Sequence, residues 1–358
     1  MKENYSFPPI VSMRLKKLRK HGIVLFFLIF GFSLLGVGLS QHLLPLEQAT
    51  ASLSRPLEQM PFSNQPIEPI PPPLILDQQK VALGKQLFHE PRLSHNNRLS
   101  CASCHSLNQA GIDRLPRSIG LQGTPSSFNA PTILNSGLNF SQFWDGRSAT
   151  LEDQIEDLIT KPNVLNTSWE EIIEKLNQEP QYVSAFRLYP EGIQAETIKD
   201  AIATFERSLT TPNSAFDRFL KGETAALTSS EKAGYERFKS YGCIACHQGV
   251  NIGGNMFQSL GVMADYFKGE GKTPTKADLG RFNVTGDPRD RHVFKVPSLR
   301  NVALTAPYFH DGHLKTLPEV VNIMAKYQLG RPIPPEDVAL IVQFLQTLTG
   351  EVQPRGKV

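Results

Sequence analysis

Two stretches of this chain repeat one pattern: Cys101-Ala102-Ser103-Cys104-His105 and Cys243-Ile244-Ala245-Cys246-His247. They contain all four cysteines of the 358 residues. Cys-x-x-Cys-His is the attachment signature of c-type haem, in which both thiols form thioethers with the porphyrin and the imidazole binds one face of the iron. The pattern predicts two covalent haem c groups, the first bound by Cys101, Cys104 and His105 and the second by Cys243, Cys246 and His247.

Two other interpretations of paired cysteines fit less well. The four thiols could form one zinc site, or each pair could be a thioredoxin-like redox couple. Zinc ribbons place their pairs about 15–20 residues apart, whereas more than a hundred residues separate Cys104 from Cys243. Thioredoxin-like pairs need no histidine after the second cysteine, and both copies here have one.

The region between the two motifs contains no further strong iron ligand. From His105 to His247 there is no other histidine and no methionine. The first haem therefore has no ordinary sixth ligand from its own half of the chain. An iron with one open face can bind and activate a small molecule, whereas a six-coordinate iron mostly passes electrons.

The N-terminus has the charge pattern of an export signal. Residues 1–22 carry six basic side chains and one acidic one, and residues 23–40 are uncharged. We interpret residues 1–22 as a cytoplasmic basic segment and residues 23–40 as a signal anchor or signal peptide. Because this segment supplies most of the formal charge of +3, the remainder is slightly acidic and nothing in it suggests nucleic-acid binding. We therefore expect an exported, periplasmic protein that contacts the membrane through residues 23–40.

The rest of the chain predicts a mainly α fold of two cytochrome c-like haem domains with long loops, preceded by the apolar segment and a proline-rich tether. Seven prolines between Pro56 and Pro73 favour an extended linker. Apolar spacing predicts helices at residues 169–177 and 195–209, one ending at Gly242, and one that begins at Pro334 or Pro335 and ends at Gly350. The predicted boundaries are linker 41–76, N-terminal domain 77–224, C-terminal domain 225–350 and tail 351–358.

Several long motifs resemble those of the bacterial di-haem cytochrome c peroxidases. They lie at residues 87–94 (LFHEPRLS), 129–135 (NAPTILN), 142–147 (QFWDGR), 213–222 (NSAFDRFLKG) and 297–312 (PSLRNVALTAPYFHDG). The resemblance implies reduction of hydrogen peroxide to water with electrons from a small cytochrome c or a copper protein. It also implies a peroxidatic haem in the N-terminal domain and an electron-entry haem in the C-terminal domain.

The sixth ligand of the second iron is open from the sequence alone. The candidates are Met256, Met263, His292, His310, His313 and Met324, and a methionine on an amphipathic helix is more often part of the core. The resemblance selects Met324, because the family's axial methionine follows the YFH motif at the spacing that His310 and Met324 show. A thioether ligand raises the iron potential, which suits a site that accepts electrons.

Two residues are candidates for catalysis at the first haem. The residues taken alone favour Glu152 as an acid in the first turn of a helix capped by Thr150 and Asp153. The resemblance implies instead that Gln142 and Glu152 lie over the open iron face, where Glu152 shuttles a proton and Gln142 orients peroxide or water. Trp144, Asp145 and Arg147 would support the pocket.

One departure from the family pattern concerns the resting state of the first iron. Many relatives read SIGH where this chain has Ser118-Ile119-Gly120-Leu121, and that histidine blocks the resting iron. Leucine cannot bind iron, so we expect a five-coordinate or water-bound iron at rest. His89 and His95 precede the first motif and are the alternative ligands, although flanking residues of this kind are usually structural.

The resemblance also implies a Ca²⁺ site formed by Asn129, Thr305 and Pro307, since oxygen ligands suit a hard cation. It makes a homodimer an expectation as well. The alternatives of other classes are a non-enzymatic di-haem electron carrier or redox sensor, and a related di-haem oxidase acting on another substrate. The lack of methionine and histidine between the motifs favours the enzyme, and Met324 argues against the oxidase.

Overall fold

The computed structural model describes residues 66–351, all of which belong to one compact unit, Phe62–Val358. The predicted basic segment, the apolar segment 23–40, most of the predicted linker and residues 352–358 of the tail lie outside the described residues. Within residues 66–351 no helix is long and apolar enough to cross a membrane.

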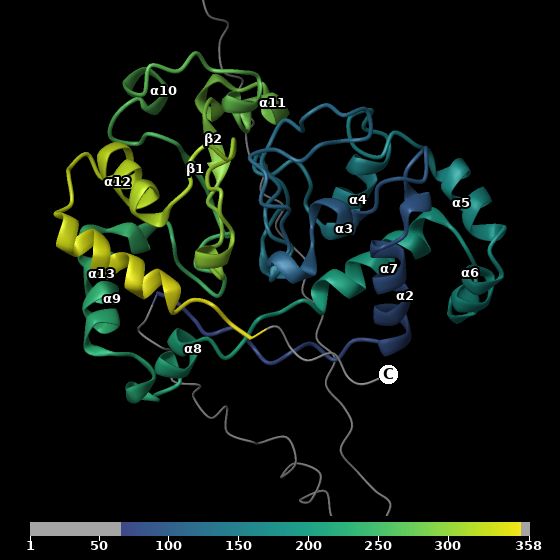
Figure 1. Ribbon diagram of the computed structural model, residues 1–358, viewed down its shortest axis with the longest axis horizontal. Coiled ribbons are helices and arrows are strands. Elements are labelled where there is room, and N and C mark those ends of the chain that lie inside the picture. The colour runs from purple at the N-terminus through teal and green to yellow at the C-terminus, as the bar shows by residue number, and fades with distance from the viewer. Residues whose placement is uncertain (1–65, 352–358) are drawn as a thin grey trace, which may run out of the picture. The chain divides into compact units, whose positions relative to one another are not determined.

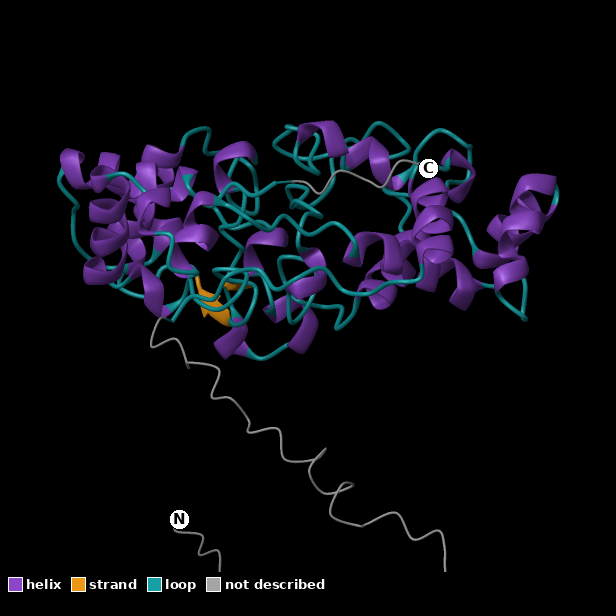
Figure 2. Ribbon diagram, turned by 90° about the horizontal axis from the view of Figure 1, so that it is seen from below, coloured by secondary structure: helices purple, strands orange, loops and turns teal. Residues whose placement is uncertain are grey.

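The described part is mainly helical, as predicted, with long loops between short helices (Figures 1 and 2). Its one sheet is a two-stranded antiparallel pair that aligns Phe257 with Lys295. The elements are α2 Gln78–Phe88, α3 Cys101–Cys104, α4 Leu151–Ile159, α5 Trp169–Asn177, α6 Pro180–Ala185, α7 Ala195–Arg207, α8 Ala215–Leu220, α9 Ser229–Tyr241, β1 Phe257–Ser259, α10 Tyr266–Gly269, α11 Phe282–Thr285, β2 Val293–Lys295, α12 Leu317–Gln328 and α13 Pro335–Gln346.

Local capping chemistry explains the helix ends that the sequence predicted. The Thr150 hydroxyl accepts a hydrogen bond from the Asp153 amide, and the Asp153 carboxylate accepts one from the Thr150 amide, which completes a capping box. Gly242, in the left-handed region at φ 95°, ends α9. Helix α5 has the predicted bounds, α7 ends two residues early, and α13 ends at Gln346 rather than at Gly350.

Each half is built on a pair of helices that approach closely at a glycine (Figure 1). Helix α2 packs on α7, where a Cβ on Gly84 would lie 1.9 Å from the Ala201 carbonyl oxygen. Helix α9 packs on α13, where a Cβ on Gly234 would lie 2.0 Å from the Leu340 carbonyl oxygen. A side chain at either glycine would therefore push the helices apart. In each half the first helix of the pair precedes the Cys-x-x-Cys-His motif in the chain.

Two hydrophobic cores draw most of their residues from different parts of the chain, and the change from one core to the other comes slightly before the predicted domain boundary at 224/225. One core draws its buried residues from the segment between Leu83 and Leu209. A second begins at Phe216, includes residues up to Leu348, and also takes in Ile67. The crossover between cores thus precedes α8. The division into two separate domains remains a prediction, since the described residues form one compact unit.

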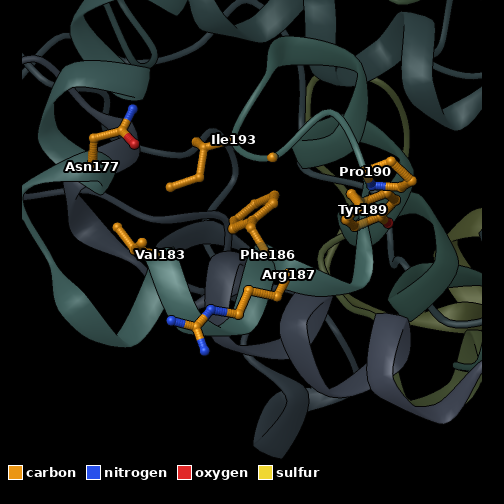
Figure 3. Close-up of a pocket in the computed structure, with 8 residues that line it drawn as sticks. Asn177, Val183, Phe186, Arg187, Tyr189, Pro190 and Ile193 are labelled. Atoms are coloured by element: carbon orange, nitrogen blue, oxygen red, sulfur yellow. The ribbon is translucent and has the colours of Figure 1, made fainter.

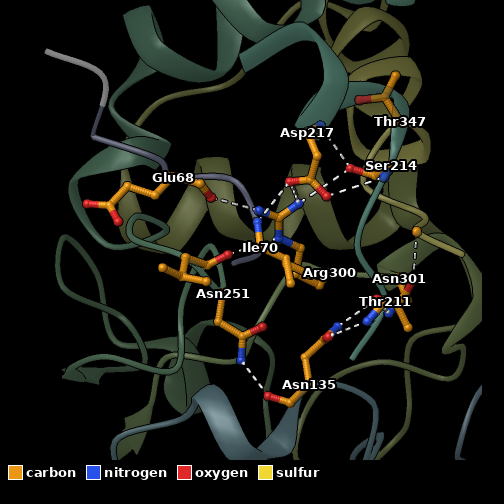
Figure 4. Close-up of polar contacts among 12 residues, drawn as sticks. Glu68, Ile70, Asn135, Thr211, Ser214, Asp217, Asn251, Arg300, Asn301 and Thr347 are labelled. Atoms are coloured by element: carbon orange, nitrogen blue, oxygen red, sulfur yellow. Dashed lines mark hydrogen bonds and ion pairs between the residues drawn. The ribbon is translucent and has the colours of Figure 1, made fainter. Parts of the chain in front are cut away.

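The predicted linker is shorter than expected at its C-terminal end. Ile67 and Ile70 are buried, at 0% and 1% exposure. The Ile70 amide donates to Asp217, and the Glu68 carbonyl accepts from Arg300 (Figure 4). Residues 66–70 therefore belong to the folded unit, because Ile67 joins the second core and Ile70 is buried, which the sequence pattern does not reveal.

Candidate functional site

The first Cys-x-x-Cys-His motif forms a short helix that ends in a buried histidine. Cys101 and Cys104 begin and end α3, and His105 follows at its C-terminus. The His105 Nδ1 lies 3.1 Å from the Gly111 carbonyl oxygen, to which it donates as N–H. Burial lowers the pKa of His105. The imidazole is therefore neutral and its Nε2 lone pair is available to a metal.

The second motif repeats this arrangement with a different backbone. Cys243 begins a 3₁₀ turn, and the left-handed Gly242 separates that turn from α9. The His247 Nδ1 lies 3.3 Å from the Ile252 carbonyl oxygen. Burial lowers the pKa of His247 to about 4. Both histidines thus have one ring nitrogen held by a backbone carbonyl, which fixes the orientation of the ring and leaves the other nitrogen as a ligand.

Neither alternative use of the cysteines fits the described structure. Among residues 66–351 no group of three or more His, Cys, Asp or Glu side chains could hold a metal ion, so the pairs do not converge on one zinc. Burial raises the pKa of the Cys101 thiol to about 12 and that of Cys243 to about 11. Thioredoxin-like cysteines need the opposite shift.

A cavity of about 600 Å³ opens beside the first motif. Cys101, Cys104 and His105 line it, together with apolar residues of α4 and α7. Two buried polar atoms at the cavity, the Ser118 hydroxyl and one Glu206 carboxylate oxygen, have no hydrogen-bond partner. Two thiols, one imidazole, apolar walls and unpaired polar atoms are the lining that a covalently bound haem with its polar propionates requires, so the residues fit this group.

The cavity offers no second strong iron ligand. Among the residues that line it, His105 is the one histidine and there is no methionine. Ser118 and Gly120 of the SIGL segment line it, while Leu121 does not. His89 bonds the Lys85 carbonyl and His95 pairs with Glu171, and neither borders the cavity. The structure therefore does not bring the two alternative histidines to the first motif.

Glu152 lies at the edge of the cavity rather than on its wall. It shares one face of α4 with Ile155 and Ile159, which line the cavity, but sits one turn closer to the helix N-terminus. Both carboxylate oxygens lie 2.8 Å from nitrogens of the Arg207 guanidinium. Both side chains are about one-third exposed. This bidentate pair therefore fixes a carboxylate that is partly exposed to solvent and belongs to a residue one helical turn from the cavity lining.

Gln142 is buried in the loop that precedes α4. Its side-chain amide donates to the Ser136 carbonyl at 3.1 Å, and its backbone pairs with Ser148. It does not line the cavity. In the structure, Glu152 and Gln142 thus hydrogen-bond to other residues rather than to each other, and neither lines the cavity.

The three residues expected to support the pocket do contact it. Trp144, Asp145 and Arg147 all line the cavity. The Trp144 indole N–H donates to the Asn129 carbonyl at 3.0 Å. Arg147 donates to Asp145 and to Asp157 of α4. These bonds attach the 142–147 segment to α4, the helix that carries Glu152.

Sequence reasoning missed Glu206. This residue is the last but one of α7 and directly precedes Arg207. Its side chain is 7% exposed and lines the cavity, and burial raises its pKa to about 8. A carboxyl in such a position stays protonated at neutral pH and can donate a hydrogen bond. The available signal was an acidic residue within the apolar stripe of α7, next to Ile202 and Phe205.

The candidates for the sixth ligand of the second iron lie in different surroundings. Met324 is on α12 and packs against the aromatic cluster that contains Tyr266, whereas Val321 and Ala325 of the same helix belong to the core that includes Cys243. Met263 is 61% exposed. The three candidate histidines have other partners: His292 bonds the Asp278 carbonyl, His310 bonds the Asp278 carboxylate, and His313 bonds Asp311 and Tyr266. The bond from His292 Nδ1 to a carbonyl is of the same kind as those of His105 and His247 and leaves Nε2 free. These contacts therefore do not exclude His292 or Met256, and Met324 as the sixth ligand stays a prediction.

The predicted calcium residues are not joined by hydrogen bonds in the described part of the chain. The Asn129 amide donates to the Leu115 and Pro116 carbonyls, and its backbone N–H donates to the His310 carbonyl at 2.7 Å. The Thr305 hydroxyl donates to the Val302 carbonyl, and Pro307 follows a cis peptide bond. Asn129 thus connects the two halves of the chain close to the YFHDG segment.

A second cavity, of about 380 Å³, lies on α6 and the loop after it (Figure 3). Phe186 and Ile193 point toward it, and Val183 and Arg187 lie along its rim. None of the predicted site residues lines this cavity. We therefore assign it no part in the site.

This chain is similar in sequence to known proteins whose family is described as having two haems. The family model of di-haem cytochrome c peroxidases matches residues 78–225. The chain is 49% identical to cytochrome c peroxidase Ccp of Escherichia coli over 293 residues, and 43% identical to cytochrome c551 peroxidase of Nitrosomonas europaea over 292 residues. Each match covers 81% of this chain. The chain belongs to the bacterial di-haem cytochrome c peroxidase family.

The relatives differ in how much of their own length is matched. The chain spans 62% of the Escherichia coli protein and 85% of the Nitrosomonas europaea protein. A crystal structure of a MauG-like protein associated with microbial copper homeostasis is similar with a TM-score of 0.70 and 31% identity, covering 79% of this chain and 93% of that one. Membership of this family implies two haem c groups and an oxidoreductase acting on peroxide.

Proposed function

We propose that this protein reduces hydrogen peroxide to water with electrons from a small cytochrome c or a copper protein. The observation that supports it best is the cavity at the first motif, where His105 and two thiols meet apolar walls and no second strong iron ligand. Each peroxide requires two electrons and two protons, and donors of this kind deliver one electron at a time. A chain with two haem motifs can hold one electron at each haem, and it can therefore collect the two electrons that one peroxide needs.

We assign the cofactor-binding residues by motif. Cys101 and Cys104 would hold the first haem and Cys243 and Cys246 the second, with His105 and His247 as iron ligands. When bound, the two haem c groups supply one iron that reacts with peroxide and one that accepts and stores an electron. The carbonyls of Gly111 and Ile252 orient the two histidines toward these groups.

The chain supplies protons from the edge of the cavity. Glu152 is positioned by Arg207, reaches solvent on one side, and lies one turn from the cavity wall on the other. We infer that it accepts a proton from the inner oxygen of peroxide and returns one to the outer oxygen, which becomes water. Gln142 would orient peroxide or a water molecule through its side-chain amide. Release of one of the two Arg207 bonds would let Glu152 turn into the cavity.

We further propose that the first iron has no protein ligand on its open face at rest, because Leu121 replaces a histidine and the cavity lining offers no other. Met324 is the proposed sixth ligand of the second iron, which suits electron entry. Asn129, Thr305 and Pro307 are proposed to bind Ca²⁺ through oxygen atoms. Since Asn129 already joins the two halves, an ion there would stiffen that junction.

The proposed location is the periplasmic side of the cytoplasmic membrane. Residues 23–40 would act as an anchor or a signal peptide, and fractionation of cells expressing the full chain, before and after a salt wash, separates these two roles. A homodimer is a further expectation, which light scattering of the purified protein tests. No partner among nucleic acids is expected.

Steady-state peroxide consumption with a reduced cytochrome c or copper protein tests the proposed activity. We expect saturable turnover that stops when the donor is exhausted. A di-haem electron carrier or sensor would be oxidised and reduced without turnover. An oxidase of another substrate would consume peroxide only when that substrate, rather than the donor protein, was present.

A further inference from the structure

A hydrogen-bonded relay of tyrosine, histidine and aspartate lies in the C-terminal half, away from the first cavity. The Tyr266 hydroxyl lies 3.1 Å from His313 Nε2, and His313 Nδ1 lies 2.5 Å from the Asp311 carboxylate. Lys272 donates to both ends of the relay, at 3.2 Å to the Tyr266 oxygen and 3.3 Å to Asp311. None of these four residues has a role in the proposed reduction of peroxide.

The partners determine the direction of each hydrogen bond. A carboxylate accepts hydrogen bonds, so the Nδ1 of His313 carries the proton that Asp311 receives. The Nε2 of His313 is then the basic nitrogen and accepts from the Tyr266 hydroxyl. This is the order of groups by which an aspartate orients an imidazole so that it can take a proton from a hydroxyl.

The relay runs from the interior to the surface. Tyr266 is 0% exposed, whereas the side chains of His313 and Asp311 are about 30% exposed. Burial raises the pKa of Tyr266, so the phenol is neutral and its proton is in place. A buried phenol next to an imidazole that reaches solvent is suited to lose its proton and an electron together, because no charge is left in the interior.

A run of closely spaced rings connects Tyr266 to the first cavity. The Tyr266 and Phe267 ring centroids are 5.1 Å apart, Phe267 and His310 are 6.4 Å apart, and His310 and Trp144 are 6.4 Å apart. Trp144 lines the cavity. Tyr266 also shares a hydrophobic cluster with Met324. Packed rings at these separations provide short steps for an electron between the relay and either half of the protein.

We propose that Tyr266 is a redox-active tyrosine that yields an electron to the peroxide-oxidised protein while its proton moves to His313. The O–H bond of Tyr266 breaks, Nε2 of His313 gains the proton, and the oxidised protein is reduced by one electron. The phenoxyl radical regains an electron from the donor protein and the proton from His313. This inference rests on the proposed peroxidase function, since peroxide is the oxidant. The tyrosine protects the protein when peroxide arrives before the donor.

The neighbouring Tyr327 provides a matched control. It is 2% exposed and its ring centroid lies 5.2 Å from that of Tyr266. Its hydroxyl donates to Glu270 rather than to a histidine. Hydrogen bonds from Tyr327 and Lys326 lower the pKa of Glu270. A carboxylate of this kind is a weaker base than an imidazole, so Tyr327 should keep its proton.

The test uses the full-length holoprotein, mixed with peroxide in the absence of donor and frozen for electron paramagnetic resonance. We expect a tyrosyl radical, narrowed by ring-deuterated tyrosine, in the wild type and in Tyr327→Phe. The signal should be lost in Tyr266→Phe and weakened in His313→Gln, which retains a hydrogen-bonding side chain of similar size but lacks the base. An equally strong radical in Tyr266→Phe would overturn the inference.

A second measurement separates this inference from the proposed function. Peroxide turnover with reduced donor is measured on the same samples, and normal turnover without any tyrosyl radical defeats the inference alone. If turnover is absent, flash-generated tris(bipyridine)ruthenium(III) replaces peroxide as the one-electron oxidant. Phenoxyl formation that depends on Tyr266 and slows in heavy water then supports the relay, and its absence rejects it.

Discussion

Glu152 shows how one ion pair can control where a catalytic acid stands. It occupies the cavity-facing side of α4, yet Arg207 holds its carboxylate at the cavity edge with two bonds of 2.8 Å. Glu206, the neighbour of Arg207, enters the cavity itself and is protonated because burial raises its pKa. Glu206 therefore lines the cavity as a buried acid, whereas Glu152 lies one helical turn from the lining and has access to solvent.

Replacing Glu152 by glutamine should slow peroxide reduction by about 10²–10⁴ in kcat, because glutamine preserves size and hydrogen bonding but cannot transfer a proton. Steady-state consumption of peroxide with reduced donor measures the loss. Glu156→Gln is the control on the same helix, since its carboxylate bonds Trp169 and Lys199 at the surface. Full turnover by Glu152→Gln would assign the proton transfer to another group.

A histidine in place of Leu121 should close the open face of the first iron. The segment that contains Leu121 contributes Ser118 and Gly120 to the cavity lining, and we expect a longer basic side chain at position 121 to reach the cavity. In the electron paramagnetic resonance spectrum of the oxidised wild type, we expect the first iron to give a high-spin signal. In Leu121→His this signal should be replaced by an additional low-spin signal. Gln122→His, at the next residue, should leave the spectrum unchanged. Two low-spin irons in the wild type would contradict an open face.

At the scale of elements, the short segment that follows α10 connects the halves through side chains. Residues Lys276 and Ala277 line the cavity of the first motif although they belong to the second half. Next to them, the Asp278 carboxylate lies 2.6 Å from His310 Nε2 and accepts from Thr275. His310 in turn packs face to face on Phe294 of β2, with ring centroids 4.5 Å apart.

Stability should fall in acid as Asp278 is protonated. Burial works to raise the pKa of Asp278, but bonds from His310 and Thr275 outweigh it and hold the pKa at about 2. An acid whose pKa is lower in the folded protein than in the unfolded chain stabilises the fold. For Asp278 this contribution is complete above the unfolded pKa of 3.8 and is lost as the pH falls through the folded pKa of about 2. The contribution at neutral pH is about 2 kcal/mol.

Denaturant unfolding of Asp278→Asn between pH 2 and pH 7 measures this contribution. The variant should be less stable than the wild type at pH 7, and the difference should shrink as the pH approaches 2. The exposed Glu191→Gln should follow the wild type throughout. A difference in unfolding free energy that does not depend on pH would show that Asp278 acts through shape rather than charge.

At the scale of the whole molecule, buried polar side chains join segments that are far apart in the chain (Figure 4). Arg300 is 1% exposed, lies 2.6 Å from the Asp217 carboxylate, and donates to the Glu68 carbonyl. Nearby, Thr211 bonds Asn135 of the first half and Asn301 of the second. These buried hydrogen bonds therefore join Glu68 in the predicted linker to the second half. They also join Asn135 in the first half to Asn301, which in turn accepts from Gly350 after α13.

Removing the charge of Arg300 should destabilise the fold by about 3–5 kcal/mol, because Asp217 would be left as an unpaired buried charge. Denaturant unfolding of Arg300→Met measures this cost. The double variant Arg300→Met, Asp217→Leu should recover much of the loss, since no charge then remains buried. A single variant that costs less than about 1 kcal/mol would mean that the pair behaves like a surface ion pair.

The order of residues was sufficient to predict the two haem motifs, the mainly helical fold and the family, because these depend on spacing within a few residues or on long ordered motifs. The capping box at Thr150 and the end of α9 at Gly242 were predictable for the same reason. Other features depend on residues far apart in the chain: the burial of Ile67 and Ile70, the pairing of Glu152 with Arg207, and the entry of Glu206 into the cavity. The tertiary structure alone decides these, since they require packing of elements whose contacts no local pattern encodes.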